Sequence, residues 1–171
     1  MRIFQYPHAG IVQPTRIFVT SLALSSQDIG NYSKIVAHMT KVLATRPEGI
    51  AISSNQALNN ALGKIPSCFL YRDQLYINPS YRGAYDSEQH SDTIELGDGP
   101  ATILVPESCL SYHEPVLTTR FQTVYVTYHR RIPGTMQFEL VREYLKGLDA
   151  IVFQHETDHL KGVGIWTFLN K

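Results

Sequence analysis

Two histidines late in the sequence have the spacing of a metal-binding pair. Residues 154–160 read Gln-His-Glu-Thr-Asp-His-Leu, so His155 and His159 are four positions apart in the pattern His-Glu-x-x-His. On a helix, both imidazoles lie on one face, one turn apart, and can bind the same ion. Glu156 is then placed to accept a proton from a metal-bound water. The pattern predicts a metal-dependent hydrolase.

The alternative interpretation is a pair of surface histidines on an amphipathic helix. Leu148, Ile151 and Val152 lie seven, four and three residues before His155 and therefore share its helical face. The histidines thus continue an apolar face, where an imidazole pair without a partner would be costly. We expect the pair to face the core.

A third protein ligand is expected upstream of the pair. Only 12 residues follow His159, and Ile165 stands where a metzincin pattern would have its third histidine. A thiolate is the strongest donor among the upstream candidates. The candidates are Cys109, Cys68, His8, His38, His90, His113 and His129.

The elements that position these residues are predicted from periodicity and turn signals. A helix is predicted over 28–44 and a second over 141–161, with Gly162 at its C-terminal end. Strands are predicted over 69–77, which ends at Asn78-Pro79, and over 102–105, where the strand is buried. A polar surface insertion is predicted at 81–100, and a hairpin pairs 123–128 with 135–140. Residues 1–24 are expected to be irregular chain with edge strands.

This order of elements favours the α+β class: antiparallel strands packed around a late, buried helix that carries His-Glu-x-x-His, with one N-terminal helix. The length of 171 residues corresponds to a single domain, 1–171. Hydrophobic residues make up 43% of the chain and charged residues 18%, and this composition excludes a disordered polyelectrolyte. Fifteen basic residues balance fifteen acidic ones, so we expect no nucleic-acid partner. We also expect no membrane span, a cytoplasmic location, and free thiols rather than a disulfide.

Three segments, in this order, resemble the motifs of the peptide deformylase family. Residues 49–56, Gly-Ile-Ala-Ile-Ser-Ser-Asn-Gln, are similar to its glycine-rich first motif, which ends in Gln. Residues 107–111, Glu-Ser-Cys-Leu-Ser, resemble its second, Glu-Gly-Cys-Leu-Ser, and residues 154–160 match its third at every defined position. Tyr6-Pro7 and Ile77-Asn78-Pro79 also fit, so the resemblance covers most of the chain.

The resemblance implies an enzyme that removes the N-formyl group from the initiator methionine of new polypeptides and releases formate. Cys109, His155 and His159 would hold one divalent metal, typically Fe²⁺, with Zn²⁺, Ni²⁺ or Co²⁺ as substitutes. The substrates would be formyl-Met nascent polypeptides, with transient contact to the ribosome. The tail after His159 is too short for the extended C-terminal helix of some members, so docking through such a helix is not expected.

The resemblance also implies roles in the reaction. Glu156 would accept the proton of the attacking water and pass it to the leaving amine. The Gln56 side-chain amide and the backbone N–H of Leu110 would meet the oxyanion. Leu148, Ile151 and Val152, with Val105, would form an apolar slot for the methionine side chain; the alternative is a purely structural role in the core.

Residues around the ligands have implied supporting roles. Glu107 is expected to pair with Arg120, the alternative being a surface salt bridge of little energy. Asp158 is expected to support the metal site, the alternative being a structural helix contact. Cys68 is expected to be a small core residue.

The departures from the family pattern lie close to the chemistry. Ala51 replaces a glycine where the substrate backbone is expected, Ser53 and Ser54 replace an alanine pair, and Ser108 replaces the glycine before Cys109. There are two alternative functions. One is a divergent member with an altered substrate, which would act as another amidase or peptidase. The other is a non-catalytic module that binds N-terminal methionine.

Overall fold

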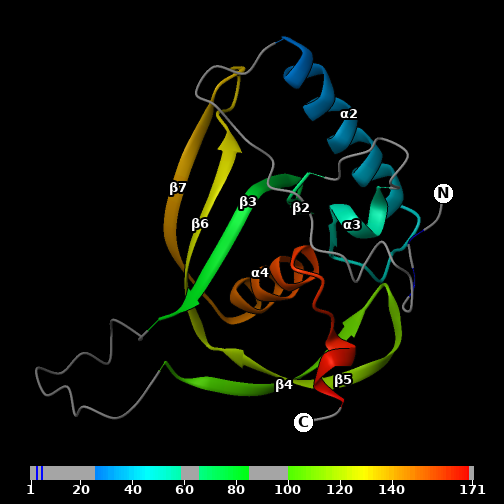
Figure 1. The fold of residues 1–171 in the computed structure, drawn as a ribbon, viewed down its shortest axis with the longest axis vertical. Helices are drawn as coiled ribbons and strands as arrows, with labels where there is room; N and C mark the ends of the chain where they lie inside the picture. Colours follow the sequence, from blue (N-terminus) through cyan, green and yellow to red (C-terminus); the bar gives the residue numbers. More distant parts are fainter. Residues whose placement is uncertain (1–2, 4, 6–25, 59–65, 85–99, 170–171) are drawn as a thin grey trace, which may run out of the picture.

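The fold places one helix between two antiparallel sheets (Figure 1). This computed structural model describes residues 3, 5, 26–58, 66–84 and 100–169. The larger sheet has the strand order β1-β2-β3-β6-β7, and β4 pairs with β5 in the smaller one. The expected class, α+β with antiparallel strands and a late helix, is confirmed.

The described elements have the following bounds. The strands are β1 Ala51–Ser53, β2 Cys68–Tyr71, β3 Gln74–Gly83, β4 Thr102–Cys109, β5 Tyr112–Phe121, β6 Thr123–Arg131 and β7 Phe138–Lys146. The helices are α2 Ser26–Leu43, α3 Ser54–Ala57, α4 Gly147–Leu160 and the 3-10 helix η3 Ile165–Phe168. The first expected helix, 28–44, corresponds to α2. The irregular chain expected over 1–24 lies outside the described residues, except for Ile3 and Gln5.

The predicted hairpin around Pro133-Gly134 is present, but its pairing differs from the expected one, because residues 123–128 pair with 141–146 and not with 135–140. Strand β6 pairs with β7 from Thr123–Lys146 to Arg131–Phe138. Gly134 adopts a φ of 75° in the connection, a conformation that glycine reaches without steric cost.

The start predicted for the last helix is wrong. Residues 141–146 belong to β7, and α4 begins at Gly147, whose φ of 58° separates strand from helix. Val141 and Leu145 pack against the core from the strand, whereas Tyr144 is 60% exposed. Their spacings of three and four suggested a helix, but pairing with β6 decides the structure. The end of α4 is as predicted, because Gly162 follows it with a φ of 79°.

Two strand predictions need correction. Residues 69–77 form two strands joined by Arg72 and Asp73, both with positive φ, as a tight hairpin turn requires. The chain does not turn at Asn78-Pro79, because β3 continues through a bulge there. The segment 102–105 is the start of a strand that runs to Cys109, and it is largely exposed rather than buried, with Leu104 69% exposed.

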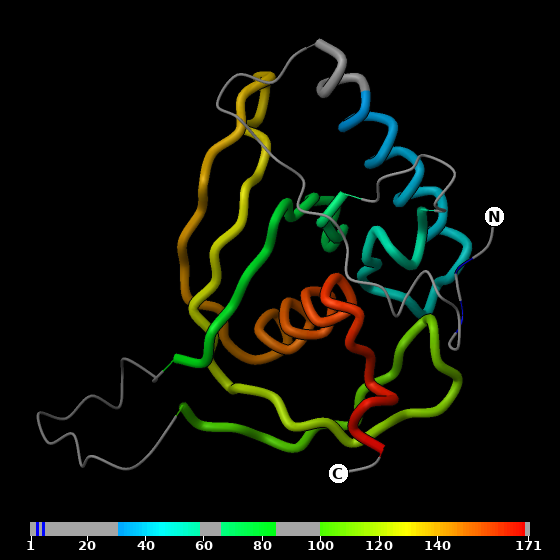
Figure 2. Tube along the Cα trace, in the orientation of Figure 1, coloured from blue at the N-terminus to red at the C-terminus, as the bar shows by residue number. Residues whose placement is uncertain are grey.

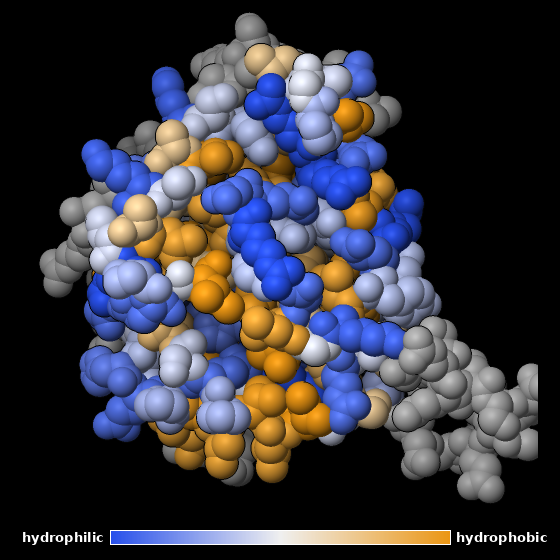
Figure 3. Space-filling model, turned by 180° about the vertical axis from the view of Figure 1, so that it is seen from behind, coloured by the Kyte–Doolittle hydropathy of each residue, from blue (hydrophilic) through white to orange (hydrophobic). Residues whose placement is uncertain are grey.

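The region predicted as a polar insertion is only partly described. Residues 81–83 belong to β3, and residues 85–99 lie outside the described part of the chain. Figure 3 shows apolar side chains gathered low on the face seen from behind, where β4 and β5 lie, and Leu104 and Leu117 are exposed on these strands.

Helix α4 is the central element of the core. Val152, Phe153 and Leu160 pack against buried side chains of β2 and β6, whereas a second cluster joins α2 and α3 to the other face of β2 and β3. Figure 2 shows the chain after α4 passing directly to β4 and β5, where η3 packs. Within the described residues, none of the helices combines the length and apolarity that a membrane crossing needs.

Candidate metal centre and active site

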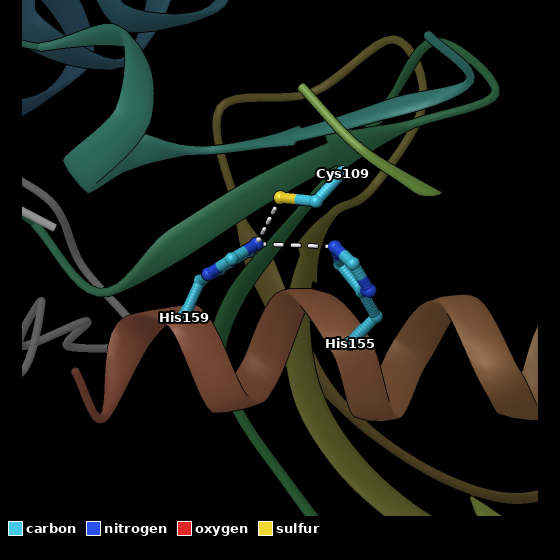
Figure 4. Close-up of side chains that lie close together, drawn as sticks. All are labelled: Cys109, His155 and His159. Carbon is cyan, nitrogen blue, oxygen red and sulfur yellow. Dashed lines mark hydrogen bonds between the residues drawn. The ribbon is translucent and has the colours of Figure 1, made fainter. Parts of the chain in front are cut away.

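The three expected ligands converge at one point (Figure 4). His155 and His159 project from the same side of α4, and Cys109 reaches them from the end of β4. The Nε2 atoms of the two histidines are 3.0 Å apart, and Sγ of Cys109 is 3.2 Å from Nε2 of His159. All three ligand atoms lie within 4.8 Å of one another.

This arrangement fits a divalent metal ion. Bonds of about 2.0 Å to nitrogen and 2.3 Å to sulfur in a tetrahedral site put the ligand atoms roughly 3.3–3.6 Å apart. The His155–His159 and Cys109–His159 distances are a few tenths of an ångström shorter than this. His159 is fully buried, and burial lowers its pKa well below the ordinary value, so its ring is neutral as a metal ligand must be. Burial opposes the charge of His155, but hydrogen bonds to Cys109 and Glu107 raise its pKa to about 10, so this ring would give up a proton when a metal binds. Two neutral rings and one thiolate would then form a typical set for a soft or borderline cation.

Glu107 fixes the orientation of His155. Its Oε2 lies 2.5 Å from Nδ1 of His155, and its carboxylate also accepts hydrogen bonds from Arg120 and Thr118. Burial opposes ionisation, but the hydrogen bonds from His155 and Arg120 lower the pKa of Glu107 to about 2. An ionised carboxylate only accepts, so Nδ1 carries a proton and Nε2 is the ring nitrogen that would bind the metal.

Arg120 connects this carboxylate to Asp158 of α4. Its Nε lies 2.5 Å from Glu107 and its Nη1 lies 2.5 Å from Asp158, and the guanidinium is 3% exposed. Asp158 also accepts a hydrogen bond of 2.8 Å from the hydroxyl of Tyr81. The expected Glu107–Arg120 pair is therefore present and buried. Asp158 reaches the ligands through Arg120 and Glu107, not by direct contact.

The proposed base, Glu156, is buried next to the ligands and lines a cavity with Cys109 and His155. Burial raises the pKa of its carboxyl, while the charge of His155 and a hydrogen bond from Ser53 act in the opposite direction. The Ser53 hydroxyl lies against Oε2 of Glu156 and 2.9 Å from its backbone oxygen. A carboxylate with increased proton affinity is suited to accept a proton from water.

Gln56 is held with its amide nitrogen toward the site. It belongs to the short helix α3, and its Oε1 accepts the backbone N–H of Ser53 at 2.9 Å. Its Nε2 lies 3.7 Å from Sγ of Cys109 and donates to the hydroxyl of Ser111 at 2.9 Å. The amide therefore presents N–H groups beside the metal position, as an oxyanion donor must.

The turn between β4 and β5 carries the other expected donor. Leu110 and Ser111 connect the paired residues Cys109 and Tyr112. The Ser111 N–H lies 3.4 Å from the Cys109 sulfur, and the Leu110 oxygen accepts from Gln5 at 2.7 Å. The tight turn places Leu110 in the cavity wall directly after the sulfur ligand.

A cavity of about 830 Å³ opens beside Cys109 and His155. It is large enough for a substrate side chain with its flanking backbone. Ala51, Leu148, Ile151 and Val152 line it together with His155, Glu156, Gln56 and Leu110. Ser108 lines it as well. Val105, which was expected in the same slot, is not among the lining residues.

In the described part of the chain, none of the other ligand candidates joins the group of Cys109, His155 and His159. Cys68 is buried in the cluster with α2, and burial raises the pKa of its thiol to about 12, as fits a core residue. His38 contacts the backbone oxygen of Ala57, and His113 lies on the cavity wall. His8 and His90 are outside the described residues.

Several contacts at the site were not predicted. Asn55 donates to the backbone oxygen of His159 at 2.5 Å, and Gln154 pairs with both backbone groups of Phe121. Trp166 of η3 packs near the His159 ring, with centroids 5.9 Å apart. Ser53 and Gln154 lie within the motifs named above, but no local pattern indicates which residues they contact.

Comparison with known proteins agrees with this geometry. The family model described as "Polypeptide deformylase" matches residues 1–171. The chain belongs to the polypeptide deformylase family. Peptide deformylase 2 of Bacillus cereus is 43% identical over 68 residues, 38% of this chain and 34% of that protein. The peptide deformylase of Thermotoga neapolitana is 36% identical over 84 residues, 41% of this chain and 48% of that protein.

The structural similarity extends over nearly the whole chain. The Plasmodium falciparum peptide deformylase superposes with a TM-score of 0.71 at 20% identity, covering 99% of this chain and 90% of that one. The Thermotoga maritima enzyme gives a TM-score of 0.71 at 24% identity, covering 98% and 95%. The sequence alignments with the curated relatives thus span about a third to a half of their length, whereas the deformylase fold is shared throughout.

Proposed function

We propose that this chain is a peptide deformylase, a metal-dependent hydrolase that removes the N-formyl group from the N-terminal methionine of newly made polypeptides. The observation that carries the proposal is the convergence of the ligand atoms of Cys109, His155 and His159 next to the cavity that Glu156 and Gln56 line. These donors would hold one divalent ion, with Fe²⁺ expected and Zn²⁺, Ni²⁺ or Co²⁺ as substitutes. We expect the reaction to take place in the cytoplasm.

The chain's own residues would divide the chemistry between them. Cys109, His155 and His159 would hold the metal, which would acidify a bound water and polarise the formyl carbonyl. Glu156 accepts a proton from the water while the water oxygen forms a bond to the formyl carbon. The Gln56 amide and the backbone N–H of Leu110 donate to the oxyanion, each worth about 3 kcal/mol of barrier. Glu156 then returns the proton to the amine nitrogen as the C–N bond breaks, giving formate and a free amino terminus.

The cavity supports a formyl-methionine substrate. Ile151 and Val152 present apolar surface one turn before His155, and Leu148 lies at the mouth, where it is 56% exposed. An unbranched thioether side chain fits such a wall. Ala51 lines the same space, and we propose that its methyl group limits how closely the substrate backbone approaches. The proposed partners are nascent polypeptides that begin with formyl-Met, which the protein would encounter during transient contact with the ribosome.

Formate release from formyl-Met-Ala-Ser tests the proposal. The protein should be purified without air, because a thiolate–Fe²⁺ site is open to oxidation. We expect turnover by the wild type and a loss of roughly 10²–10⁴-fold in kcat for Glu156→Ala. Metal content should stay at one ion per chain in both proteins. Glu114→Ala removes an exposed carboxylate of β5 outside the cavity and should leave turnover unchanged.

Three results would overturn the proposal. Full turnover by Glu156→Ala would reject this residue as the base. Faster cleavage of internal peptide bonds than of the formyl group would indicate another amidase or peptidase. Tight binding of the peptide by Fe²⁺-loaded protein without formate would indicate a module that only binds N-terminal methionine.

A further inference from the structure

Ser53 differs from the family pattern and contacts the proposed base. It is the last residue of β1, where the first motif of the family has alanine, and it is fully buried. Its hydroxyl faces both Oε2 and the backbone oxygen of Glu156. A hydroxyl has one proton to donate, and an ionised carboxylate is a stronger acceptor than a backbone carbonyl. The hydrogen bond to Oε2 is therefore the favoured one.

The backbone of Ser53 has a second, separate contact in the site. Its N–H donates to Oε1 of Gln56 at 2.9 Å, which turns the amide nitrogen of Gln56 toward Cys109. One residue thus meets the proposed oxyanion donor through its backbone and the proposed base through its side chain. A change to alanine keeps this backbone contact and removes the hydroxyl, which contacts Glu156 and also caps α3 at the backbone of Gln56.

Holding one oxygen of Glu156 restricts the other. The last torsion of a glutamate side chain is intrinsically broad, so a carboxylate without a fixed partner samples many orientations. Ser53 is anchored by the pairing of β1 with β2, through Ser53–Phe69, and by the N-terminus of α3. Its hydroxyl is therefore a fixed point against which the carboxylate is oriented.

We propose that Ser53 is a positioning residue for Glu156, whose hydroxyl holds Oε2 and leaves Oε1 directed at the attacking water. This inference rests on the proposed deformylase function. It concerns the orientation of the base, because the hydroxyl proton of Ser53 is directed at Glu156, while its oxygen also caps α3 at the backbone of Gln56. The departure from alanine is thus assigned a role in the chemical step.

The test compares kcat and KM for Ser53→Ala, Ser53→Thr and Ser54→Ala in formate release. Ser54 is the matched control, because it is equally buried but donates to the backbone oxygen of Pro66 at 2.5 Å, away from Glu156. We expect Ser53→Ala to lose roughly tenfold in kcat at unchanged KM. Ser53→Thr keeps the hydroxyl in an extended segment that suits a β-branched residue, and should stay within about threefold of the wild type.

The outcomes separate this inference from the proposed function. No formate from wild-type protein would reject the deformylase function itself. An active wild type, with Ser53→Ala and Ser54→Ala alike in kcat, would reject the positioning role, as would a change confined to KM. An equal loss in Ser53→Thr would show that the hydroxyl is not responsible. Thermal unfolding checks that each variant is folded, and Ser53→Gly provides the same comparison should Ser53→Ala not fold.

Discussion

At the scale of single residues, Glu107 is expected to control metal affinity without being a ligand. It holds Nδ1 of His155 at 2.5 Å and is itself held by Arg120. Glu107→Gln keeps the shape but removes the charge that fixes the tautomer of His155. Loss of such a partner typically weakens metal binding by about 10–100-fold, which is the effect we expect here. Competition with a chromophoric chelator measures it.

Glu139→Gln is the control for this change. Glu139 pairs with Arg130 at 2.7 Å, but both side chains are about 40% exposed and lie on the β6–β7 hairpin. The metal affinity of the Glu139→Gln variant should equal that of the wild type. An affinity in Glu107→Gln that also equals the wild type would show that His155 needs no orienting partner.

The residue types at the site were more predictable than their contacts. The spacing of His155 and His159 is local, so a helical period was enough to place both rings together. Elimination alone left seven candidates for the third ligand, and only the resemblance singled out Cys109. The Ser53–Glu156 contact joins residues about a hundred positions apart and depends on how β1 meets α4, which no local pattern encodes.

At the scale of elements, Arg120 joins three segments that surround the site. It lies on β5 and pairs with Glu107 of β4 and Asp158 of α4, all buried. Arg120→Leu would leave two carboxylates buried without their cation. Breaking a buried pair by removing one partner costs about 3–5 kcal/mol, and we expect the free energy of unfolding to fall by this amount. Urea unfolding monitored by circular dichroism measures it.

Arg130→Leu offers the matched comparison in an exposed pair. Exposed ion pairs are worth about 1 kcal/mol or less, so this variant should stay within that range of the wild type. Equal losses in the two variants would mean that burial of the Arg120 pairs has no energetic consequence.

The element boundaries show where the sequence was ambiguous. Val141, Tyr144 and Leu145 satisfy a helical spacing, yet they lie on a strand because β6 provides a nine-residue partner. Gly147, with its positive φ, marks the true start of α4. The sequence alone does not show that this glycine has a left-handed conformation, because that follows only when residues 141–146 are known to form a strand. By contrast, Gly162 ends α4 through bonds from residues 162 and 163 to the oxygens of His159 and Asp158, a local motif that sequence does reveal.

At the scale of the whole molecule, the site connects parts of the fold that are otherwise separate. Cys109 comes from the smaller sheet and the two histidines from α4, which packs on the larger sheet. The order of the elements in the sequence was enough to predict the class of the fold. It did not predict that residues from the smaller sheet and from α4 would form one site. An ion bound at this point would hold the sheets together, so metal binding and global stability should be linked.

We therefore expect metal to stabilise the folded chain. An ion that binds only the folded state raises the free energy of unfolding by about 2.7 kcal/mol at a free concentration 100 times its Kd. Thermal unfolding with increasing Zn²⁺ measures this as a rising Tm. Cys109→Ala loses the sulfur ligand that joins the sheets and should show little rise. Cys68→Ala removes the other thiol, which is buried away from the site, and should keep the full rise despite a lower starting Tm. A rise in Cys109→Ala equal to that of the wild type would place the stabilising ion elsewhere, because the two histidines alone do not connect the smaller sheet to α4.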